Sequence, residues 1–398
     1  MKRFFLALSF CLCALCCVFA APAVSDSARV SFVICSPGSN VYELEGHAAM
    51  RVVLPDGRDL AVNYGIFDFD SPNFIYRFVK GETDYMVAAY PFSIFLESYV
   101  RDGREVVEYP IALDAGETSA LLELLSRNLM PDKRVYRYNY VKDNCSTRLF
   151  GLVEDAVGDT VAMQAPGYTD GWSFRDAMRH YHRNYPWYQF GIDLALGSGI
   201  DYPISEHEKA FAPHLLIDML PTARIAGQSL VADSPVRYAG RGTGGPQGPT
   251  PWPLTPMAVS LYILAGVILC AVADIRRRRV SRWVDIIFMS VAGLAGCLLA
   301  FLVFISVHEA TSPNWLIVWL NPLCFIVPAC VYIKKCVRLV LLYEIVNFVA
   351  LFLLCMLWPF TGQSANEAFW PLIAADMILS ARYIYIIYAS CAKKQIQA

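Results

Sequence analysis

Cys145 is the residue of this 398-residue chain whose type and surroundings best suit covalent chemistry. It stands in Asp143-Asn144-Cys145-Ser146-Thr147, just ahead of an amphipathic run that predicts a helix over 146–156. Asp143 or Asn144 can cap that helix, which would place Cys145 in its first turn. Free backbone N–H groups and the positive end of the helix dipole favour a thiolate and an oxyanion there. The pattern is typical of a cysteine nucleophile.

A cysteine nucleophile needs a base, and His47 is the preferred candidate because it begins a predicted strand, which fixes its side chain. The other histidines of the first 256 residues lie in less regular sequence: His180, His182, His207 and His214. Asn63, on the next predicted strand, is the candidate for orienting the imidazole. A shift of one residue in register would turn Asn63 away and present Tyr64, on the other face, instead.

Structural interpretations of the same residues stay open. Cys145 could form a disulfide with Cys35, or be an inert buried thiol. His47 taken alone fits a structural histidine, and Asn63 a turn or edge residue. The remaining 11 of the 13 cysteines lie in apolar sequence at the two ends of the chain, and no Cys/His spacing suggests zinc, so we expect no metal and no cofactor.

The elements that must position these residues are strands and helices in mixture. Strands are predicted over 30–35, 47–54, 60–64 and 105–111, with Asp56-Gly57 as the turn between the second and third. Helices are predicted over 117–129 and 146–156, with short helical pieces around 173–182 and 206–220. The mixture predicts an α+β domain with an antiparallel sheet.

Composition separates this domain from a membrane part. The chain is 56% hydrophobic and only 17% charged. Residues 24–256 hold 20 Lys/Arg and 29 Asp/Glu, whereas residues 257–398 hold 11 and 6. An acidic domain argues against nucleic acid as the partner, because phosphate binding needs a basic face.

Targeting signals predict where each part lies. Residues 1–20 resemble a signal peptide, with an uncleaved anchor or lipidation at Cys16 or Cys17 as alternatives. Five apolar stretches, at about 257–273, 283–306, 315–333, 337–358 and 370–391, are each long enough to span a bilayer. The basic clusters fall on one side of these spans, which predicts a cytoplasmic C-terminus and a periplasmic domain over 24–234, in the inner membrane. Residues 235–256, rich in Gly and Pro, predict a linker before the membrane domain over 257–398.

Three ionisable residues lie within the predicted spans: Glu344, Asp376 and Arg382. Such residues are costly in lipid and are usually paired or functional. Glu344 and Arg382 could pair, or Arg382 could snorkel while Asp376 lies near the outer interface.

Three motifs also resemble a known family. These are Gly46-His47-Ala48-Ala49-Met50-Arg51-Val52, Asn63-Tyr64-Gly65-Ile66-Phe67-Asp68-Phe69-Asp70 and Asp143-Asn144-Cys145-Ser146-Thr147-Arg148. Together they look like the Lnb N-terminal periplasmic domain family, long catalogued as a domain of unknown function, over about residues 28–230. The His-then-Cys order is similar to permuted papain-like folds of the NlpC and lecithin:retinol acyltransferase types. That resemblance implies Cys145 as the nucleophile and His47 as the base, with Asn63 matching loosely; Tyr64, Asn144 and Asp143 are supporting candidates.

Three classes of function follow from these observations. The leading one is a membrane-anchored cysteine hydrolase or acyltransferase that acts through an acyl-thioester on an amide or ester of the cell envelope: a peptide, a lipid or a lipoprotein. The second is a non-catalytic envelope binding or assembly module. The third is an accessory domain of a lipid-handling membrane protein.

Overall fold

The computed structural model describes residues 28–68, 70–242 and 244–396. The chain divides into two compact units. The first reaches to Phe78 and continues with Glu82–Tyr181 and Pro203–Gly248, and the second takes in Val79–Gly81, His182–Tyr202 and the chain from Pro249 onward. The predicted signal peptide, residues 1–20, lies outside the described residues.

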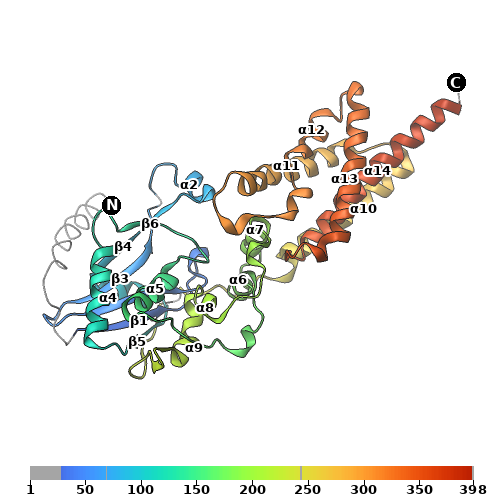
Figure 1. Cartoon of the computed structure of the whole chain (residues 1–398). Coiled ribbons are helices and arrows are strands. Elements are labelled where there is room, and N and C mark those ends of the chain that lie inside the picture. Colours follow the sequence, from blue (N-terminus) through green and yellow to red (C-terminus); the bar gives the residue numbers. More distant parts are fainter. Residues whose placement is uncertain (1–27, 69, 243, 397–398) are drawn as a thin grey trace. The chain divides into compact units, whose positions relative to one another are not determined.

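The first unit is built on an antiparallel sheet that has seven strands in the described part of the chain, in the order β6-β4-β3-β2-β1-β5-β9 (Figure 1). These strands are β1 (Arg29–Cys35), β2 (His47–Val53), β3 (Asp59–Ile66), β4 (Asp84–Pro91), β5 (Val106–Pro110), β6 (Val135–Arg137) and β9 (Val236–Tyr238). The predicted antiparallel sheet with helices is confirmed. The sequence patterns did not predict β4, β6 or β9.

Helices cover both faces of this sheet. Successive strand residues point to opposite sides, and apolar residues on both sides need cover. Ala49 of β2 packs on the face covered by α3 (Phe92–Arg101). On the other face, Phe32 of β1 stacks on Phe150 at a centroid distance of 4.9 Å. Phe150 belongs to α5 (Cys145–Val157), which packs beside α4 (Ala115–Asn128). The predicted helices over 117–129 and 146–156 therefore exist and form one layer.

Shorter elements complete the first unit. They are α2 (Phe74–Lys80) and α6 (Phe174–His182), whose last residues belong to the second unit, and α8 (Glu206–Lys209), α9 (Leu216–Met219), β7 (Arg224–Ile225) and β8 (Gln228–Ser229). The segment 235–256, predicted as a linker with little regular structure, begins with β9, which pairs with β5. A Cβ on Gly242 would lie 2.1 Å from the Arg101 carbonyl oxygen, so the chain after β9 also packs closely on this unit. The first part of the predicted linker therefore belongs to the sheet domain.

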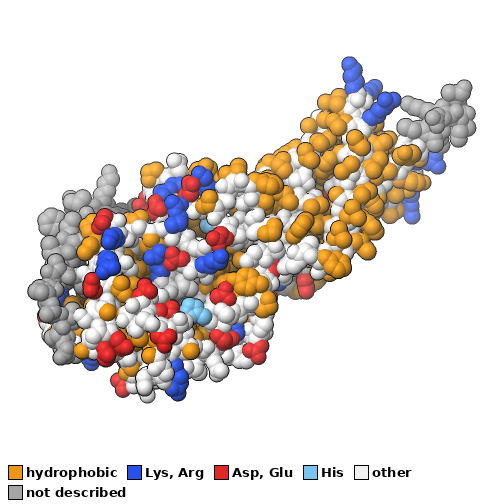
Figure 2. Space-filling model, in the orientation of Figure 1, with side chains coloured by type: hydrophobic (Ala, Val, Ile, Leu, Met, Phe, Trp, Pro, Cys, Tyr) orange, Lys and Arg blue, Asp and Glu red, His pale blue; other side chains and the backbone are white. Residues whose placement is uncertain are grey.

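The second unit is helical and apolar on its surface. It contains α7 (Pro186–Ala195), α10 (Pro256–Arg277), α11 (Arg282–Phe304), α12 (Ile326–Cys330), α13 (Val337–Leu357) and α14 (Phe369–Ile396). Within the described residues, four helices are long and apolar enough to cross a membrane: α10, α11, α13 and α14. Figure 2 shows hydrophobic side chains over these helices and Lys and Arg side chains at one end of the bundle.

The prediction of five spanning helices was wrong at 315–333. That stretch is three short helical pieces: Trp315–Val318, Pro322–Phe325 and α12. Pro322 has no N–H to donate and disfavours helical dihedrals at the preceding residue, and Asn321 is extended (φ −145°, ψ 161°). Its side chain instead caps the next piece by accepting the Leu323 N–H. Apolar composition predicted a span here, but the proline sets where the helix breaks.

Candidate functional site

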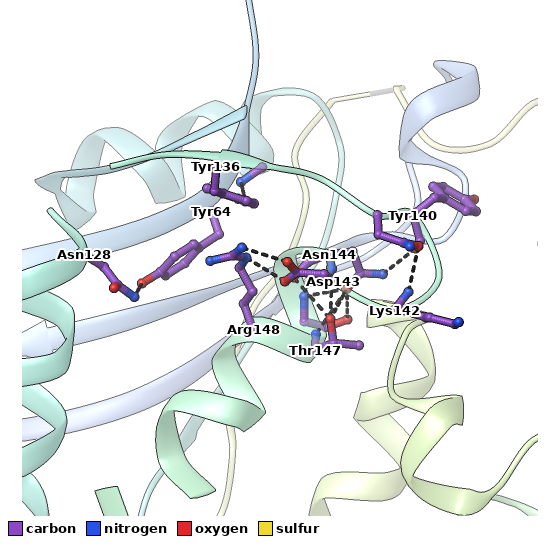
Figure 3. Close-up of polar contacts among 12 residues, drawn as sticks. Tyr64, Asn128, Tyr136, Tyr140, Lys142, Asp143, Asn144, Thr147 and Arg148 are labelled. Atoms are coloured by element: carbon purple, nitrogen blue, oxygen red, sulfur yellow. Dashed lines mark hydrogen bonds and ion pairs between the residues drawn. The ribbon is translucent and has the colours of Figure 1, made fainter. Parts of the chain in front are cut away.

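Cys145 is the first residue of α5 and therefore lies in the first turn, as predicted, and of the two capping candidates Asn144 caps the helix (Figure 3). The Asn144 Oδ1 accepts the backbone N–H groups of Ser146 and Thr147 at 3.0 and 3.1 Å. Its Nδ2 donates to the Phe211 carbonyl oxygen at 2.7 Å. Asn144 is buried, so this side chain fixes both the start of the helix and its place in the unit.

Two effects compete at the Cys145 sulfur. Burial raises the pKa of the thiol to about 11, and hydrogen bonds from the backbone N–H groups of Ala48, Ser146 and Cys145 act in the opposite direction. The side chain is only 6% exposed. The resting group is therefore a neutral thiol that already faces donors able to stabilise negative charge.

His47 and Asn63 are joined directly. The His47 Nε2 lies 2.6 Å from the Asn63 Oδ1, and the Asn63 Nδ2 donates to the Tyr90 hydroxyl at 2.9 Å. Because the amide oxygen only accepts, Nε2 carries the proton and Nδ1 keeps its lone pair. The register of β2 and β3 pairs Met50 with Val62, which puts His47 and Asn63 on one face of the sheet. This orientation could not be fixed from the sequence.

The surroundings of His47 favour the neutral imidazole. Burial lowers its pKa to about 4; the hydrogen bond to Asn63 raises it, and the positive charge of Arg104 lowers it further. Tyr99 of α3 stacks on the imidazole at a centroid distance of 6.0 Å. The Arg104 guanidinium lies over the Tyr99 ring, 4.6 Å from its centroid. A neutral imidazole with a free Nδ1 is a proton acceptor.

Cys145 and His47 are linked through the backbone of β2. The Ala48 N–H that reaches the Cys145 sulfur belongs to the residue directly after His47. Across residues 28–68, 70–242 and 244–396, the hydrogen bonds include none between the thiol and the imidazole. Gly65, in the irregular part of β3, has φ +85°, and a Cβ there would lie 3.7 Å from the Cys145 Cβ. The strand irregularity and the start of α5 therefore meet beside the thiol.

Two of the supporting candidates have other partners (Figure 3). The Tyr64 hydroxyl accepts from Asn128 of α4 at 2.9 Å, on the sheet face opposite to Asn63. Asp143 forms an ion pair with Arg148, whose Nη2 donates to Oδ2 at 2.7 Å. Asp143 thus holds the first turns of α5 together, while the capping falls to Asn144.

Cys35 and Cys145 are both free, buried thiols. Cys35 is the strand partner of His47 in the β1–β2 register. Burial raises the pKa of Cys35 above that of Cys145, which leaves Cys145 as the more acidic of the two. In the part of the chain that the structure describes, no group of three or more His, Cys, Asp or Glu side chains could hold a metal ion.

Sequence reasoning missed four contributors to the site: the Ala48 N–H, Gly65, Tyr90 and Arg104. A backbone donor leaves no sequence signal. Gly65 directly follows the predicted strand over 60–64 and lies inside the observed β3. A glycine in a strand interior is a signal for a bulge, and it could have been used had the strand been extended by two residues. Tyr90 lies on β4, which the patterns did not predict, and Arg104 lies between α3, also not predicted, and β5.

The α+β sheet domain and the four long apolar helices together define a membrane protein with an extracytoplasmic domain. Comparison with protein families agrees. Residues 21–173 match the Lnb N-terminal periplasmic domain, and residues 249–394 match the Lnb transmembrane domain. The chain therefore belongs to the family with these two Lnb domains, and the resemblance seen in the motifs is confirmed. Searches of curated proteins and of solved structures find no match.

Proposed function

We propose that the periplasmic domain is a cysteine hydrolase or acyltransferase of permuted papain-like type, anchored in the inner membrane, that acts through an acyl-thioester. The observation that carries this proposal is the position of Cys145: its sulfur lies at a helix start, near the backbone N–H groups of Ala48 and Ser146, and Ala48 directly follows the imidazole-bearing residue. Burial without donors would suit an inert thiol equally well, but N–H groups directed at the sulfur suit a developing negative charge.

The residues suggest the following steps. The His47 Nδ1 takes the thiol proton as the sulfur attacks a carbonyl carbon, and the carbonyl electron pair moves to oxygen, facing the N–H groups of Ala48 and Ser146. Collapse breaks the C–N or C–O bond, and the leaving group takes the proton from His47. A thioester on Cys145 remains. Water or an acceptor amine or hydroxyl then gives its proton to His47 and attacks the thioester carbonyl carbon; the C–S bond breaks, and the sulfur takes the proton back from His47.

Asn63 has a positioning role in this scheme. Its Oδ1 holds the Nε2–H tautomer, which directs the lone pair of Nδ1 away from Asn63 and makes it available to the thiol proton. Tyr90 fixes the amide in turn. Because thiol and imidazole are not hydrogen-bonded at rest, substrate binding must bring them together, as catalytic hydrogen bonds often tighten only in the complex.

The membrane part supplies the anchor, and we propose that it crosses the bilayer five times, the third time as a broken helix. The broken helix over residues 315–333, together with the residues just before it, contacts α11 along its whole length. Thr311 donates to the Leu302 carbonyl oxygen at 2.8 Å, near the end of α11. Asn321 packs against Gly296 in the middle, where a Cβ would lie 2.4 Å from the Asn321 nitrogen.

At the far end of the segment, the Arg282 guanidinium lies 5.4 Å from the Tyr332 ring centroid, at the start of α11. A segment that runs antiparallel to a spanning helix from end to end crosses the same thickness. Lys334 and Lys335 then lie on the side of Arg282, with the C-terminus, which is cytoplasmic by the positive-inside rule.

The enzymatic proposal is tested by turnover of p-nitrophenyl acetate and p-nitrophenyl palmitate by the full chain in mild detergent. Cys145→Ala should abolish p-nitrophenol release, and His47→Gln should lower kcat by about 10²- to 10⁴-fold. Two matched controls should retain full activity: Cys297→Ala, an exposed thiol of the bundle, and His207→Gln, an exposed histidine that pairs with Glu154. Equal activity of Cys145→Ala and wild type would leave the non-catalytic binding module as the better account.

A further inference from the structure

The interior of the bundle formed by α10, α11, α13 and α14 contains a set of polar side chains in two separately bonded parts. Its ionisable members are Asp274, Asp285, Glu344, Asp376 and Arg382, each at most 3% exposed. All lie within or at the ends of helices that are apolar enough to span a membrane. Burying one such group in hydrocarbon is costly, so five together call for a physical account.

The first part of the set is an ion-paired triad. The Arg382 Nη1 donates to the Asp274 Oδ2 at 2.7 Å, and its Nη2 pairs with Asp285. One guanidinium therefore faces two carboxylates from two other helices. These pairs account for the charge of Arg382, and the predicted pairing of Arg382 with Glu344 is replaced by pairs with Asp274 and Asp285.

The second part is a chain of hydrogen bonds with a fixed direction. The Asn347 Nδ2 donates to the Asp376 Oδ1 at 2.7 Å and to the Ser380 Oγ at 3.1 Å. The amide nitrogen has no acceptor capacity, so the Ser380 oxygen accepts and its own proton goes to the Glu344 Oε2, 2.7 Å away. The Asp376 Oδ2 is buried and makes no hydrogen bond of ordinary geometry to the described residues; the Trp319 indole N–H, likewise buried and otherwise unpaired, lies near this carboxyl.

Charge accounting then separates the two parts. If every carboxyl were ionised, the set would hold four negative charges against the single charge of Arg382. The other titratable side chains near the set are Tyr343, Tyr383, Cys270 and Cys324, none of which adds positive charge. Arg282, at the start of α11, lies near Tyr383, but its side chain is exposed and forms no ion pair with the described carboxyls of the set. A buried ion without a counter-ion costs several kcal/mol even after relaxation. A neutral carboxyl at Glu344 and at Asp376 removes that cost.

We propose that Glu344 and Asp376 form an intramembrane proton-binding site, joined through Ser380 and Asn347. The Asp376 Oδ2, which accepts no hydrogen bond of ordinary geometry, is the position for one proton, since a carboxylic acid bears its proton on one oxygen and accepts on the other, here Oδ1. The Glu344 Oε2 likewise accepts from Ser380, which leaves Oε1 for the second proton.

The set also has a direction along the bundle. Asp376 and Arg382 are six residues apart on α14, which is about 9 Å of helix. Arg382 pairs with Asp274 near the end of α10 and Asp285 near the start of α11, beside the basic residues that end one helix and begin the next. Polar groups therefore run from the basic end of the bundle toward its middle, which is the side from which protons would reach the site.

Infrared spectroscopy of the full chain in phosphatidylcholine vesicles tests the proposal, because protonated carboxyls and carboxylates absorb in separate bands. At neutral pH the wild type should show a protonated-carboxyl band from two groups. Glu344→Gln and Asp376→Asn should each remove about half of it, and the double variant all of it. Glu367→Gln, an exposed acid just before α14, should leave the band unchanged.

The wild-type protein alone can overturn the proposal, so failure of a variant to fold leaves it testable. Absence of a protonated-carboxyl band at neutral pH would show that both groups are ionised. A band that persists in a folded double variant would assign the protons elsewhere. A band that fades as the pH is raised, and returns when it is lowered, is the behaviour expected of a site that exchanges protons with the medium.

Discussion

The pH dependence of Cys145 alkylation distinguishes a neutral thiol from a preformed thiolate. With a pKa of about 11, roughly 0.01% of the thiol is ionised at pH 7, against about 3% for an ordinary cysteine of pKa about 8.5. Ionisation alone makes Cys145 about 300-fold slower. A more basic thiolate is intrinsically more nucleophilic, by roughly 10-fold here, which leaves a rate about 30-fold below that of an ordinary thiol before burial slows it further.

The assay is a time course of iodoacetamide labelling of the full chain in mild detergent, read peptide by peptide by mass spectrometry. The rate at Cys145 should rise about tenfold per pH unit from pH 7 to pH 10 without a plateau, and Cys35 in the same sample should react more slowly still, since burial raises its pKa further. A rate that levels off below pH 8, or exceeds that of a simple thiol at pH 6, would refute the neutral-thiol account and indicate an ion pair with His47.

The remaining predictions concern the groups around the thiol. Asn63→Ala frees the imidazole and should lower kcat about 10²-fold with little change in KM; an unchanged kcat would remove its positioning role. Gly65→Ala should lower the free energy of unfolding by about 1 kcal/mol because of its φ of +85°, whereas Gly151→Ala, in α5 with open space around it, should raise it by about 0.5–1 kcal/mol; equal effects in denaturant titrations would contradict this. Asn144→Ala should lower the free energy of unfolding by about 1–2 kcal/mol through loss of the cap, again measured by denaturant titration. His47 is protonated below pH about 6.5 when unfolded but only below about 4 when folded, so stability should fall as the pH is lowered through that window, by up to about 3 kcal/mol, and less in His47→Gln.

Much of the site could be predicted because its signals are local. A capping residue ahead of an amphipathic run placed Cys145 at a helix start, and the alternation of residues after His47 placed that histidine at a strand start. The relation between the two elements depends on how α5 docks on β2, which is a tertiary contact without a sequence signature. The role of the Ala48 N–H follows from that docking.

Two other differences between prediction and structure have separate origins, one in strand register and one in local sequence. Asn63 and Tyr64 are neighbours on one strand, and only the register with β2 decides which of them faces His47. In the membrane part, composition predicted a span over 315–333, yet Pro322 and the asparagines before and within the segment favour short capped pieces. Hydropathy measures where a segment is stable in lipid, and it does not report helix continuity.

Intact-mass spectrometry of the full chain, quenched in acid during turnover of p-nitrophenyl palmitate, tests the central claim most directly. The account predicts one added palmitoyl group per chain, located at Cys145, removed by hydroxylamine and absent from Cys145→Ala. Turnover without any acyl adduct on Cys145, or an adduct of equal amount in Cys145→Ala, would contradict it.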